Sequence, residues 1–298
     1  MQQTADNQKM RLPFTKMHGL GNDFMVIDCV SQPHSLSTEQ IALYADRQLG
    51  IGFDQLLQIE PATRPDADFR YRIFNRDGSE VEHCGNGARC FAKYVHDKGL
   101  TTHNPIKVET VNRLLSLQLS EDGEVTVDMG EPDFAPESLP FEAENASVDV
   151  VSGQRYRCEV VAASTTQKIE FSALSMGNPH AVVFVDSISQ VGDLLKPPIV
   201  EPADEYPDGV NVEFVQFLPD GELKMRVHER GVGETKSCGT GTCAVALAAS
   251  LKKGKRLPAN WIINPPGGRL SVEIDSHSNA ILTGPAVLIE DHDLSKYL

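Results

Sequence analysis

Short runs of apolar and β-branched residues, many of them alternating with polar positions, recur along the chain. Runs of about four to eight such residues, bounded by Gly, Asn, Asp or Pro, are typical of β-strands. They predict strands at residues 24–29, 69–74, 106–110, 114–119, 124–128, 181–185, 212–217, 222–228, 270–274 and 280–283. A final strand, 284–291, is expected to return to the first half of the chain.

Two stretches depart from this pattern and carry small and apolar residues at helical spacing. They cover 88–95 and 242–251, and each comes shortly after a cysteine, Cys84 or Cys238. Gly99 and Gly254 provide the helix stops. One helix per half among many strands predicts an α+β fold, in which a curved, mostly antiparallel sheet surrounds a central helix.

The two halves repeat one another. When Cys84 is aligned with Cys238, residues 69–87 lie over 223–241 without a gap, and Asn75 lies over Glu229. Upstream, Gly-Asn at 21–22 and 177–178 opens an apolar segment at nearly the same distance from each cysteine. Landmarks in the same order at similar spacing predict two similar domains related by a pseudo-two-fold axis.

This repeat also sets the expected domain borders. The N-terminal half is predicted to cover 11–130 and to be completed by 284–298, and the C-terminal half to cover 131–283. The stretch 131–147, rich in Pro and Glu, is expected to cross between the halves.

The composition and charge of the chain exclude some classes of function. The 298 residues carry a net charge of −15, which argues against nucleic-acid or anionic-membrane partners. The N-terminal segment lacks a signal-peptide core, and no apolar run is long enough for a membrane helix. Six cysteines without CxxC spacing predict free thiols and no metal site. We therefore expect a cytoplasmic protein.

Both repeat cysteines stand in a Cys-Gly-X-Gly sequence directly before a helix. Glycines there allow a ligand to approach the backbone closely. The unpaired N–H groups of a first helical turn bind anions, and their field is expected to lower the pKa of a cysteine. Two such thiols on opposite faces of one α-carbon could remove and return its proton without any cofactor. The pattern predicts an amino-acid racemase or epimerase.

The sequence resembles the diaminopimelate epimerase family over nearly its whole length, from about residue 11 to the mid-280s. The resemblance rests on motifs that occur in the family's order. They are Lys16-Met17-His18-Gly19-Leu20-Gly21-Asn22-Asp23-Phe24, Arg72-Ile73-Phe74-Asn75-Arg76-Asp77-Gly78-Ser79-Glu80, Glu82-His83-Cys84-Gly85-Asn86-Gly87, Gly177-Asn178-Pro179-His180, Gly209-Val210-Asn211-Val212 and 229–241.

The resemblance implies conversion of LL-2,6-diaminopimelate to the meso isomer, in lysine and peptidoglycan precursor synthesis. It implies no cofactor, no metal, a site in a cleft between the two domains, and compatibility with a homodimer. Cys84 and Cys238 would be the acid/base pair. The substrate-binding residues would be Asn22, Gln55, Asn75, Gly85, Asn86, Asn178, Asn211, Glu229, Arg230, Gly239 and Thr240, with His180 as an auxiliary group.

Three alternatives stay open at this point. A relative of the same fold, such as proline racemase, hydroxyproline epimerase or a phenazine-pathway isomerase, would share the cysteine pair. A redox module would use Cys84 and Cys238 as a switching disulfide. A binding protein would not need both cysteines. Residues 1–10 and 131–170 match no family motif, which leaves the domain borders open.

Overall fold

The chain folds into two compact units, which are described separately. In a computed structural model, the described residues are 12–81, 84–133, 147–149, 153–162, 165–194, 198 and 209–294, with the backbone alone for those from 147 to 170. The first unit comprises 23–116 with the two ends of the chain, and the second comprises 117–285 with 20–22. Residues 1–10 and most of the predicted crossing 131–147 lie outside the described residues.

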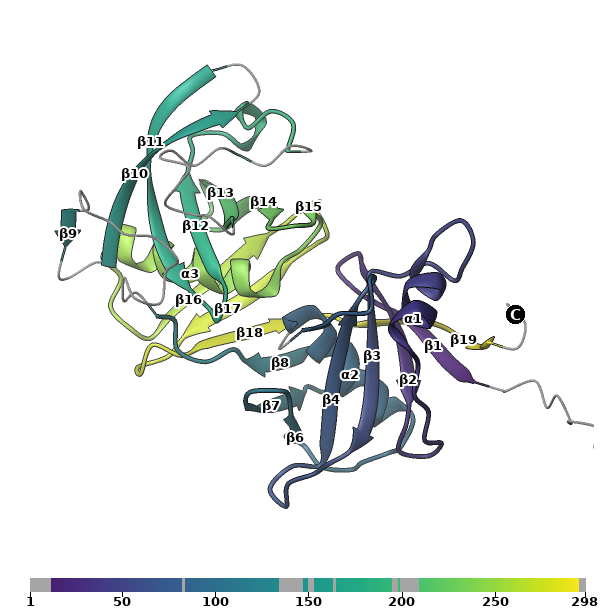
Figure 1. Ribbon diagram of the computed structural model, residues 1–298. Helices are drawn as coiled ribbons and strands as arrows, with labels where there is room; N and C mark the ends of the chain where they lie inside the picture. Colours follow the sequence, from purple (N-terminus) through teal and green to yellow (C-terminus); the bar gives the residue numbers. More distant parts are fainter. Residues whose placement is uncertain are drawn as a thin grey trace, which may run out of the picture. The chain divides into compact units, whose positions relative to one another are not determined.

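The first unit is a mixed sheet. Its strands are β1 (Pro13–Gly19), β2 (Asn22–Asp28), β3 (Gln55–Pro61), β4 (Phe69–Asn75), β5 (Glu80–Val81), β6 (Ile106–Glu109) and β19 (Val287–Asp293). Strands β2 and β3 run parallel, β3 and β4 antiparallel, and β4 pairs with both β5 and β6. β19, the predicted final strand shifted by a few residues, pairs with β1. The end of the chain thus completes the sheet with which it begins (Figure 1).

Two helices cover this sheet. Helix α2 (Gly85–Asp97) packs against β1, β3 and β19 through side chains such as Phe91, whose ring centroid lies 4.9 Å from that of Tyr71. Helix α1 (Thr38–Ala45) contributes Ile41 and Tyr44 to a second core with Met25 of β2. Neighbouring residues of a strand face opposite sides of a sheet, so β2 serves both cores.

The second unit repeats this pairing and extends it. Its strands are β8 (Val125–Asp128), β9 (Ser147–Asp149), β10 (Gly153–Ala162), β11 (Thr165–Ser175), β12 (Pro179–Phe184), β13 (Asn211–Phe217), β14 (Leu223–Glu229), β15 (Gly233–Thr235), β16 (Ala259–Asn264), β17 (Leu270–Ile274) and β18 (Ala280–Gly284), with a short 3₁₀ turn, η2 (Ile188–Gln190). β7 (Leu114–Leu119) lies at the border of the units and pairs with β8. β12 and β13 are parallel, β13 and β14 antiparallel, and β14 pairs with β15 and β16, as in the first unit.

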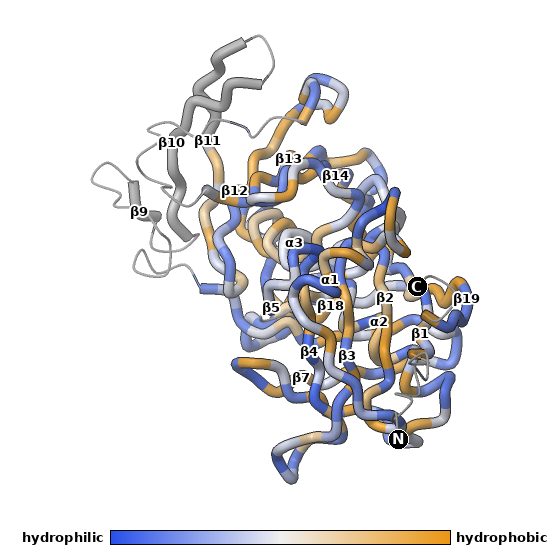
Figure 2. Tube along the Cα trace, turned by 45° about the vertical axis from the view of Figure 1, so that its right-hand side comes forward, coloured by the Kyte–Doolittle hydropathy of each residue, from blue (hydrophilic) through white to orange (hydrophobic). Residues whose placement is uncertain are grey.

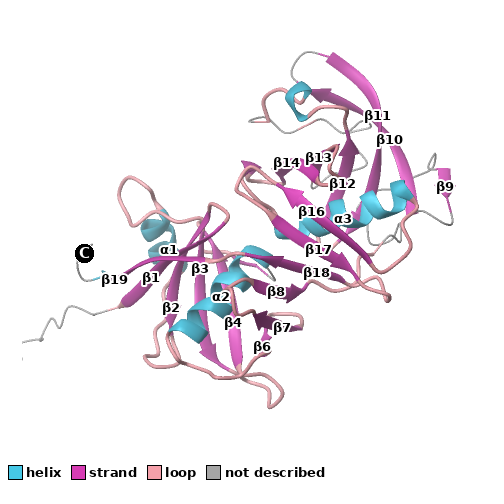
Figure 3. Cartoon of the chain, turned by 180° about the vertical axis from the view of Figure 1, so that it is seen from behind, coloured by secondary structure: helices cyan, strands magenta, loops and turns pink. Residues whose placement is uncertain are grey.

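Helix α3 (Gly239–Lys253) is the centre of this unit and contacts β11, β12, β13, β16, β17 and β18 (Figure 3). It is buried from Gly241 to Ser250, and its pale to orange colour in Figure 2 reflects its many Ala, Val and Leu residues. It ends at Gly254, whose positive φ of 59° completes the cap. No described helix is long and apolar enough to cross a membrane.

The predicted α+β class and the two similar halves are confirmed. All predicted strands occur with shifts of a few residues, as do both predicted helices. The residues 117–130 pack with the second unit, through β8 and β18, although the repeat places them in the N-terminal half. A packing unit is not by itself an independently folding domain, so the borders expected from the sequence stay predictions.

Candidate active site

Cys84 is the N-cap of α2. Its backbone is extended, with φ −145° and ψ 114°, and its sulfur accepts a hydrogen bond of 3.4 Å from the Gly87 N–H. An N-cap side chain that accepts from the third helical residue satisfies one of the N–H groups that the first turn leaves unpaired. The sulfur therefore lies at the positive end of the helix, as the sequence predicts.

Cys238 has the same place at the start of α3. Its φ and ψ are −119° and 118°, and its sulfur lies 3.4 Å from both the Gly241 N–H and the Thr240 hydroxyl. The five cysteines whose side chains are described are all free thiols. Cys90 and Cys243 are fully buried inside the two helices, where we expected core thiols.

The electrostatics of Cys238 differ from the expectation. Burial raises its pKa well above the usual range, and the carboxylates of Glu229 and Glu213 raise it further. The Thr240 hydroxyl and the Gly241 N–H lower the pKa, but they do not outweigh burial. The helix start thus acts in the predicted direction, but the net shift of the Cys238 pKa is upward, because the sulfur is removed from water beside two acidic groups.

Glu229 ends β14 beside Cys238. Burial raises the pKa of its carboxyl, whereas hydrogen bonds with the Thr235 hydroxyl and the Cys238 thiol lower it. The sequence placed Glu229 among the substrate-binding residues, but its contact with the thiol came only from the structure. This carboxyl group can accept either a thiol proton or an ammonium group.

Four further predicted residues of the second unit lie near the starts of β12 and β13 and the end of β14. Nε2 of His180 lies 3.0 Å from the Asn178 amide oxygen. The Asn211 amide donates to the Pro179 carbonyl at 2.9 Å, and its oxygen accepts from the Arg230 backbone N–H, also at 2.9 Å. Asn211 thus links the starts of β12 and β13 to the residue after β14, while the Arg230 side chain is exposed.

In the first unit the start of α2 is fixed from within by Arg89. This side chain is fully buried and donates to the Asn86 amide oxygen at 2.7 Å and to the Gly85 carbonyl at 3.2 Å. An arginine inside a helix face that is otherwise apolar signals such a buried polar contact. No sequence motif indicated this role for Arg89.

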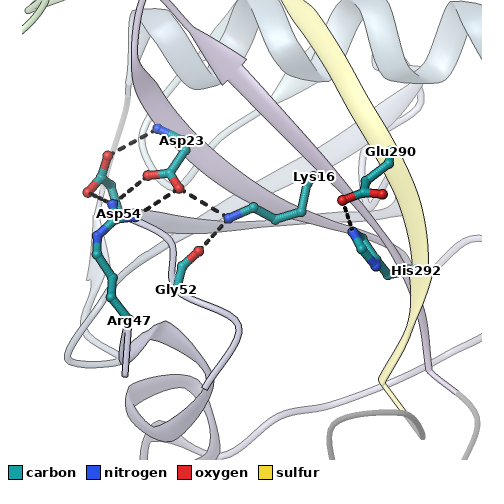
Figure 4. A network of polar contacts seen from close by, with 7 residues as sticks. All are labelled: Lys16, Asp23, Arg47, Gly52, Asp54, Glu290 and His292. Atoms are coloured by element: carbon teal, nitrogen blue, oxygen red, sulfur yellow. Dashed lines mark hydrogen bonds and ion pairs between the residues drawn. The ribbon is translucent and has the colours of Figure 1, made fainter. Parts of the chain in front are cut away.

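An ion network lies beside β2 and β3 in the same unit (Figure 4). The Arg47 guanidinium bonds to Asp23 at 2.6 Å and to Asp54 at 2.7 Å, and Lys16 bonds to Asp23 at 3.1 Å and to the Gly52 carbonyl. The Asp23 N–H also donates to Asp54 at 3.0 Å. Hydrogen bonds from Arg47 and the charge of Lys16 hold the pKa of Asp23 well below its usual range despite burial.

This network adjoins two predicted binding residues. Asn22 precedes Asp23 at the start of β2, and Gln55 follows Asp54 at the start of β3. The Gln55 amide donates to the Asn75 side chain at 3.1 Å across the β3–β4 pair. Asp23 and Asp54 therefore fix the backbone from which these side chains project.

Each cysteine begins a helix together with two of the predicted binding residues. Cys84, Gly85 and Asn86 form one helix start, and Cys238, Gly239 and Thr240 form the other. No sequence motif pointed to Glu213. It is fully buried in β13 among Val and Phe residues, and its Oε1 lies 2.7 Å from Nδ1 of His180. A lone acidic residue inside an apolar strand was the available signal.

Comparison with known proteins identifies the family. A family model described as Diaminopimelate epimerase matches residues 14–135 and 172–289. A diaminopimelate epimerase from Azotobacter vinelandii is 48% identical over 281 residues, which cover 94% of this chain and 98% of that protein. One from Pseudomonas aeruginosa is 47% identical with the same coverage. The residue ranges that the family model matches include both Cys-Gly-X-Gly segments of this chain.

Solved structures with low sequence identity share the fold. A predicted epimerase from Pseudomonas aeruginosa has a TM-score of 0.65 at 15% identity, covering 95% of this chain and 99% of that one. A hydroxyproline epimerase from Agrobacterium vitis has a TM-score of 0.63 at 16% identity, covering 96% and 93%. The low identity limits these likenesses to the fold, whereas the matched family model and the relatives near half identity establish that this chain belongs to the diaminopimelate epimerase family.

Proposed function

We propose that this isomerase converts LL-2,6-diaminopimelate to meso-diaminopimelate, with Cys84 and Cys238 as the two proton carriers. The observation that carries the proposal is the matched position of the two thiols. Each caps the N-terminus of a buried helix and accepts the N–H of the third helical residue. This arrangement supports both proton transfer and binding of a carboxylate.

In the proposed reaction one cysteine is a thiolate and removes the α-proton, and the other is a thiol and returns a proton to the opposite face. The enzyme then holds the thiolate and the thiol at exchanged positions, so no net proton is gained or lost. Burial and the neighbouring carboxylates favour the thiol form of Cys238 by raising its pKa. The face of the α-carbon that carries the proton decides which cysteine is the base, so the two cysteines exchange roles between the LL and meso isomers.

The carbanionic intermediate needs stabilisation, because an α-proton is only weakly acidic. We assign this role to the backbone N–H groups of the two helix starts, at Gly85, Asn86, Gly239 and Thr240, which would hold the reacting carboxylate. Charge that spreads from the α-carbon into the carboxylate then meets donors already in place. This accounts for a mechanism that needs no pyridoxal phosphate.

The remaining polar groups of diaminopimelate need both donors and acceptors. Arg230 offers a planar, exposed guanidinium for the distal carboxylate, and Glu229 offers a carboxylate for an ammonium group. Amide side chains can serve either group. The residues that we assign to these contacts are Asn22, Gln55, Asn75, Asn178, Asn211, Glu229 and Arg230, with His180 as an auxiliary group.

We further propose a cytoplasmic enzyme whose partner is this small molecule. The five free cysteines among the described side chains support a reducing compartment. A homodimer is the oligomeric state that the family resemblance suggests, and light scattering of the purified protein tests it.

The deciding experiment uses LL-diaminopimelate in D₂O, with purified protein and without pyridoxal phosphate. We expect the meso product with deuterium at the inverted carbon only. L-Proline and trans-4-hydroxy-L-proline under the same conditions should remain unchanged, which separates this activity from those of relatives with the same fold. Meso product without deuterium, or inversion of either proline substrate at a comparable rate, would contradict the proposal.

A further inference from the structure

The first turns of α2 and α3 rest on different surfaces, although the repeat aligns them. Below α2 the surface is apolar, with one tyrosine. A Cβ atom added at Gly87 would lie 2.2 Å from the Tyr71 hydroxyl, 3.2 Å from Leu57 and 3.5 Å from Phe24. The helix that carries Cys84 is thus supported by packed hydrocarbon and aromatic rings.

Below α3 the corresponding surface is charged. A Cβ atom added at Gly241 would lie 2.6 Å from Oε1 of Glu213. His180 and Glu213 occupy the positions that Phe24 and Leu57 hold in the first unit. The strand pairing shows this equivalence. Phe24 pairs with Gln55, and Leu57 lies two residues further along β3. In the same way His180 pairs with Asn211, and Glu213 lies two residues further along β13.

The polar pair has no evident structural advantage. Both side chains are fully buried, and Oε2 of Glu213 has no hydrogen-bond partner among the described residues. Removing an imidazole and a carboxylate from water costs more free energy than burying an apolar pair of similar volume, and their attraction often fails to recover it. The first unit shows that the same scaffold accepts Phe and Leu here, so the pair requires a functional explanation.

The hydrogen bonds indicate what the pair does. Nδ1 of His180 lies 2.7 Å from Glu213, and Nε2 lies 3.0 Å from the Asn178 amide oxygen. The Glu213 carboxylate and the Asn178 amide oxygen are both acceptors, so the two contacts are satisfied together when each ring nitrogen carries a proton. Its charge partner is Glu213, and the orientation of the Asn178 amide depends on the proton at Nε2.

We propose that Glu213 is a positioning residue, which acts through His180 to fix the Asn178 amide with its NH₂ group directed away from the ring and available to a substrate carboxylate. This inference rests on the proposed function, in which Asn178 contacts diaminopimelate. Loss of the Glu213 charge leaves a neutral imidazole, whose unprotonated Nε2 attracts the Asn178 NH₂ group. The amide then turns over and offers its oxygen to the carboxylate instead.

The test combines Glu213→Gln, which keeps the shape of the side chain, with Asn178→Ala. Glu213→Gln should raise KM and lower kcat/KM by roughly ten- to a hundredfold, because the distal end of the substrate is misplaced. In the Asn178→Ala background the same change should have little further effect, which shows that the two residues act as one unit. Equal losses in both backgrounds would mean that Glu213 does not act through Asn178, and would overturn the inference.

A second variant separates function from folding. His180→Phe with Glu213→Leu copies the surface below α2 and should give a Tm at least as high as that of the wild type, with kcat/KM still reduced. Wild-type kcat/KM in this double variant would show that the pair has no role in the reaction.

Nitrogen-15 NMR of the His180 ring gives a readout that needs no activity. Both ring nitrogens should be protonated in the wild type at neutral pH, and only one in Glu213→Gln. An unprotonated Nδ1 in the wild type would overturn the inference even if diaminopimelate is epimerised. Wild-type protein that leaves diaminopimelate unchanged, but shows the expected ring protonation, would instead contradict only the proposed function.

Discussion

Nδ1 of His180 lies 2.7 Å from Oε1 of Glu213, and neither side chain has any exposed surface. In the repeat these residues replace an apolar pair of the first unit. The two helix starts are therefore alike in backbone geometry and in their capping sulfur, but different in the charge below them. The difference leads to separate expectations for the two cysteines.

The cysteine pair is tested by Cys84→Ala and Cys238→Ala. Each change removes one of two obligatory proton carriers, so epimerisation should fall below detection while the Tm stays near that of the wild type. Cys243→Ala provides the matched control, because this thiol lies in the same helix as Cys238 but is buried in the core. Turnover near the wild-type rate in either cysteine variant would exclude the two-base mechanism.

Alkylation should distinguish Cys238 from an ordinary cysteine. Iodoacetamide reacts with the thiolate, and the raised pKa keeps Cys238 in the thiol form to higher pH in the folded than in the unfolded protein. At pH 8 the native protein should therefore be modified at Cys238 more slowly than the urea-unfolded protein, and the difference should narrow at pH values well above 9. Peptide mass spectrometry measures both rates, and equal rates at pH 8 would contradict the assignment.

The ion network of Figure 4 should stabilise the first unit in a pH-dependent way. Asp23→Asn should lower the free energy of unfolding at pH 7 by about 1–3 kcal/mol, because Asp23 bonds to both Arg47 and Lys16. The pKa of Asp23 is depressed on folding, so this stabilisation is present above its ordinary value of about 4 and is lost as the pH falls below it.

Urea unfolding of Asp23→Asn and wild type at pH 7 and pH 3 measures this effect. Asp66→Asn is the control, because Asp66 also bonds to an arginine, Arg64, but both side chains are about half exposed, at 49% and 48%. Its effect should stay within about 0.5 kcal/mol. A difference for Asp23→Asn that does not shrink at pH 3 would show that the charge is not responsible.

Arg230→Lys tests the binding of the distal carboxylate. Lysine keeps the charge but loses the planar fork, so kcat/KM should fall by roughly one to two decades while the alkylation rates of Cys84 and Cys238 change little. The protection that diaminopimelate gives against alkylation should require higher concentrations. An unchanged kcat/KM would remove Arg230 from the substrate-binding set.

Gly87→Ala tests the close approach of α2 to the sheet. The added Cβ would meet the Tyr71 hydroxyl at 2.2 Å, so the helix start must shift, and kcat/KM should fall by about tenfold or more. Adding Tyr71→Phe removes the hydroxyl oxygen and should restore part of the activity. If the double variant is no more active than Gly87→Ala alone, the contact with Tyr71 is not the cause.

The spacing of apolar residues along the chain predicted those parts of the fold whose local sequence pattern matches their burial in the structure. The two long helices follow Cys-Gly-X-Gly and end near glycines, and most strands alternate or are rich in Val and Ile. Strand β3, with the buried run Leu56 to Ile59, was missed because a central strand buried on both faces does not alternate. Helix α1 was missed because eight residues are too few to show a helical period clearly.

The same limit applies to the site. The cysteines, the glycines and the binding residues near them follow from motifs, and Cys84 and Cys238 each begin a helix, as the motifs predict. Glu213 could not be assigned, because its partner His180 is distant in sequence and meets it only through the parallel pairing of β12 and β13. The raised pKa of Cys238 likewise depends on burial and on carboxylates from two strands, which no local motif encodes.

Strand β1 finds one of its two neighbours only at the far end of the chain, since Pro13 pairs with Asp293. During synthesis the ribosome must therefore release almost the entire polypeptide before this edge of the first sheet can close. The second unit likewise needs β18 (Ala280–Gly284) to pair with β8, so its sheet also closes late. Until β19 emerges, β1 presents an open edge to chaperones and to other nascent chains.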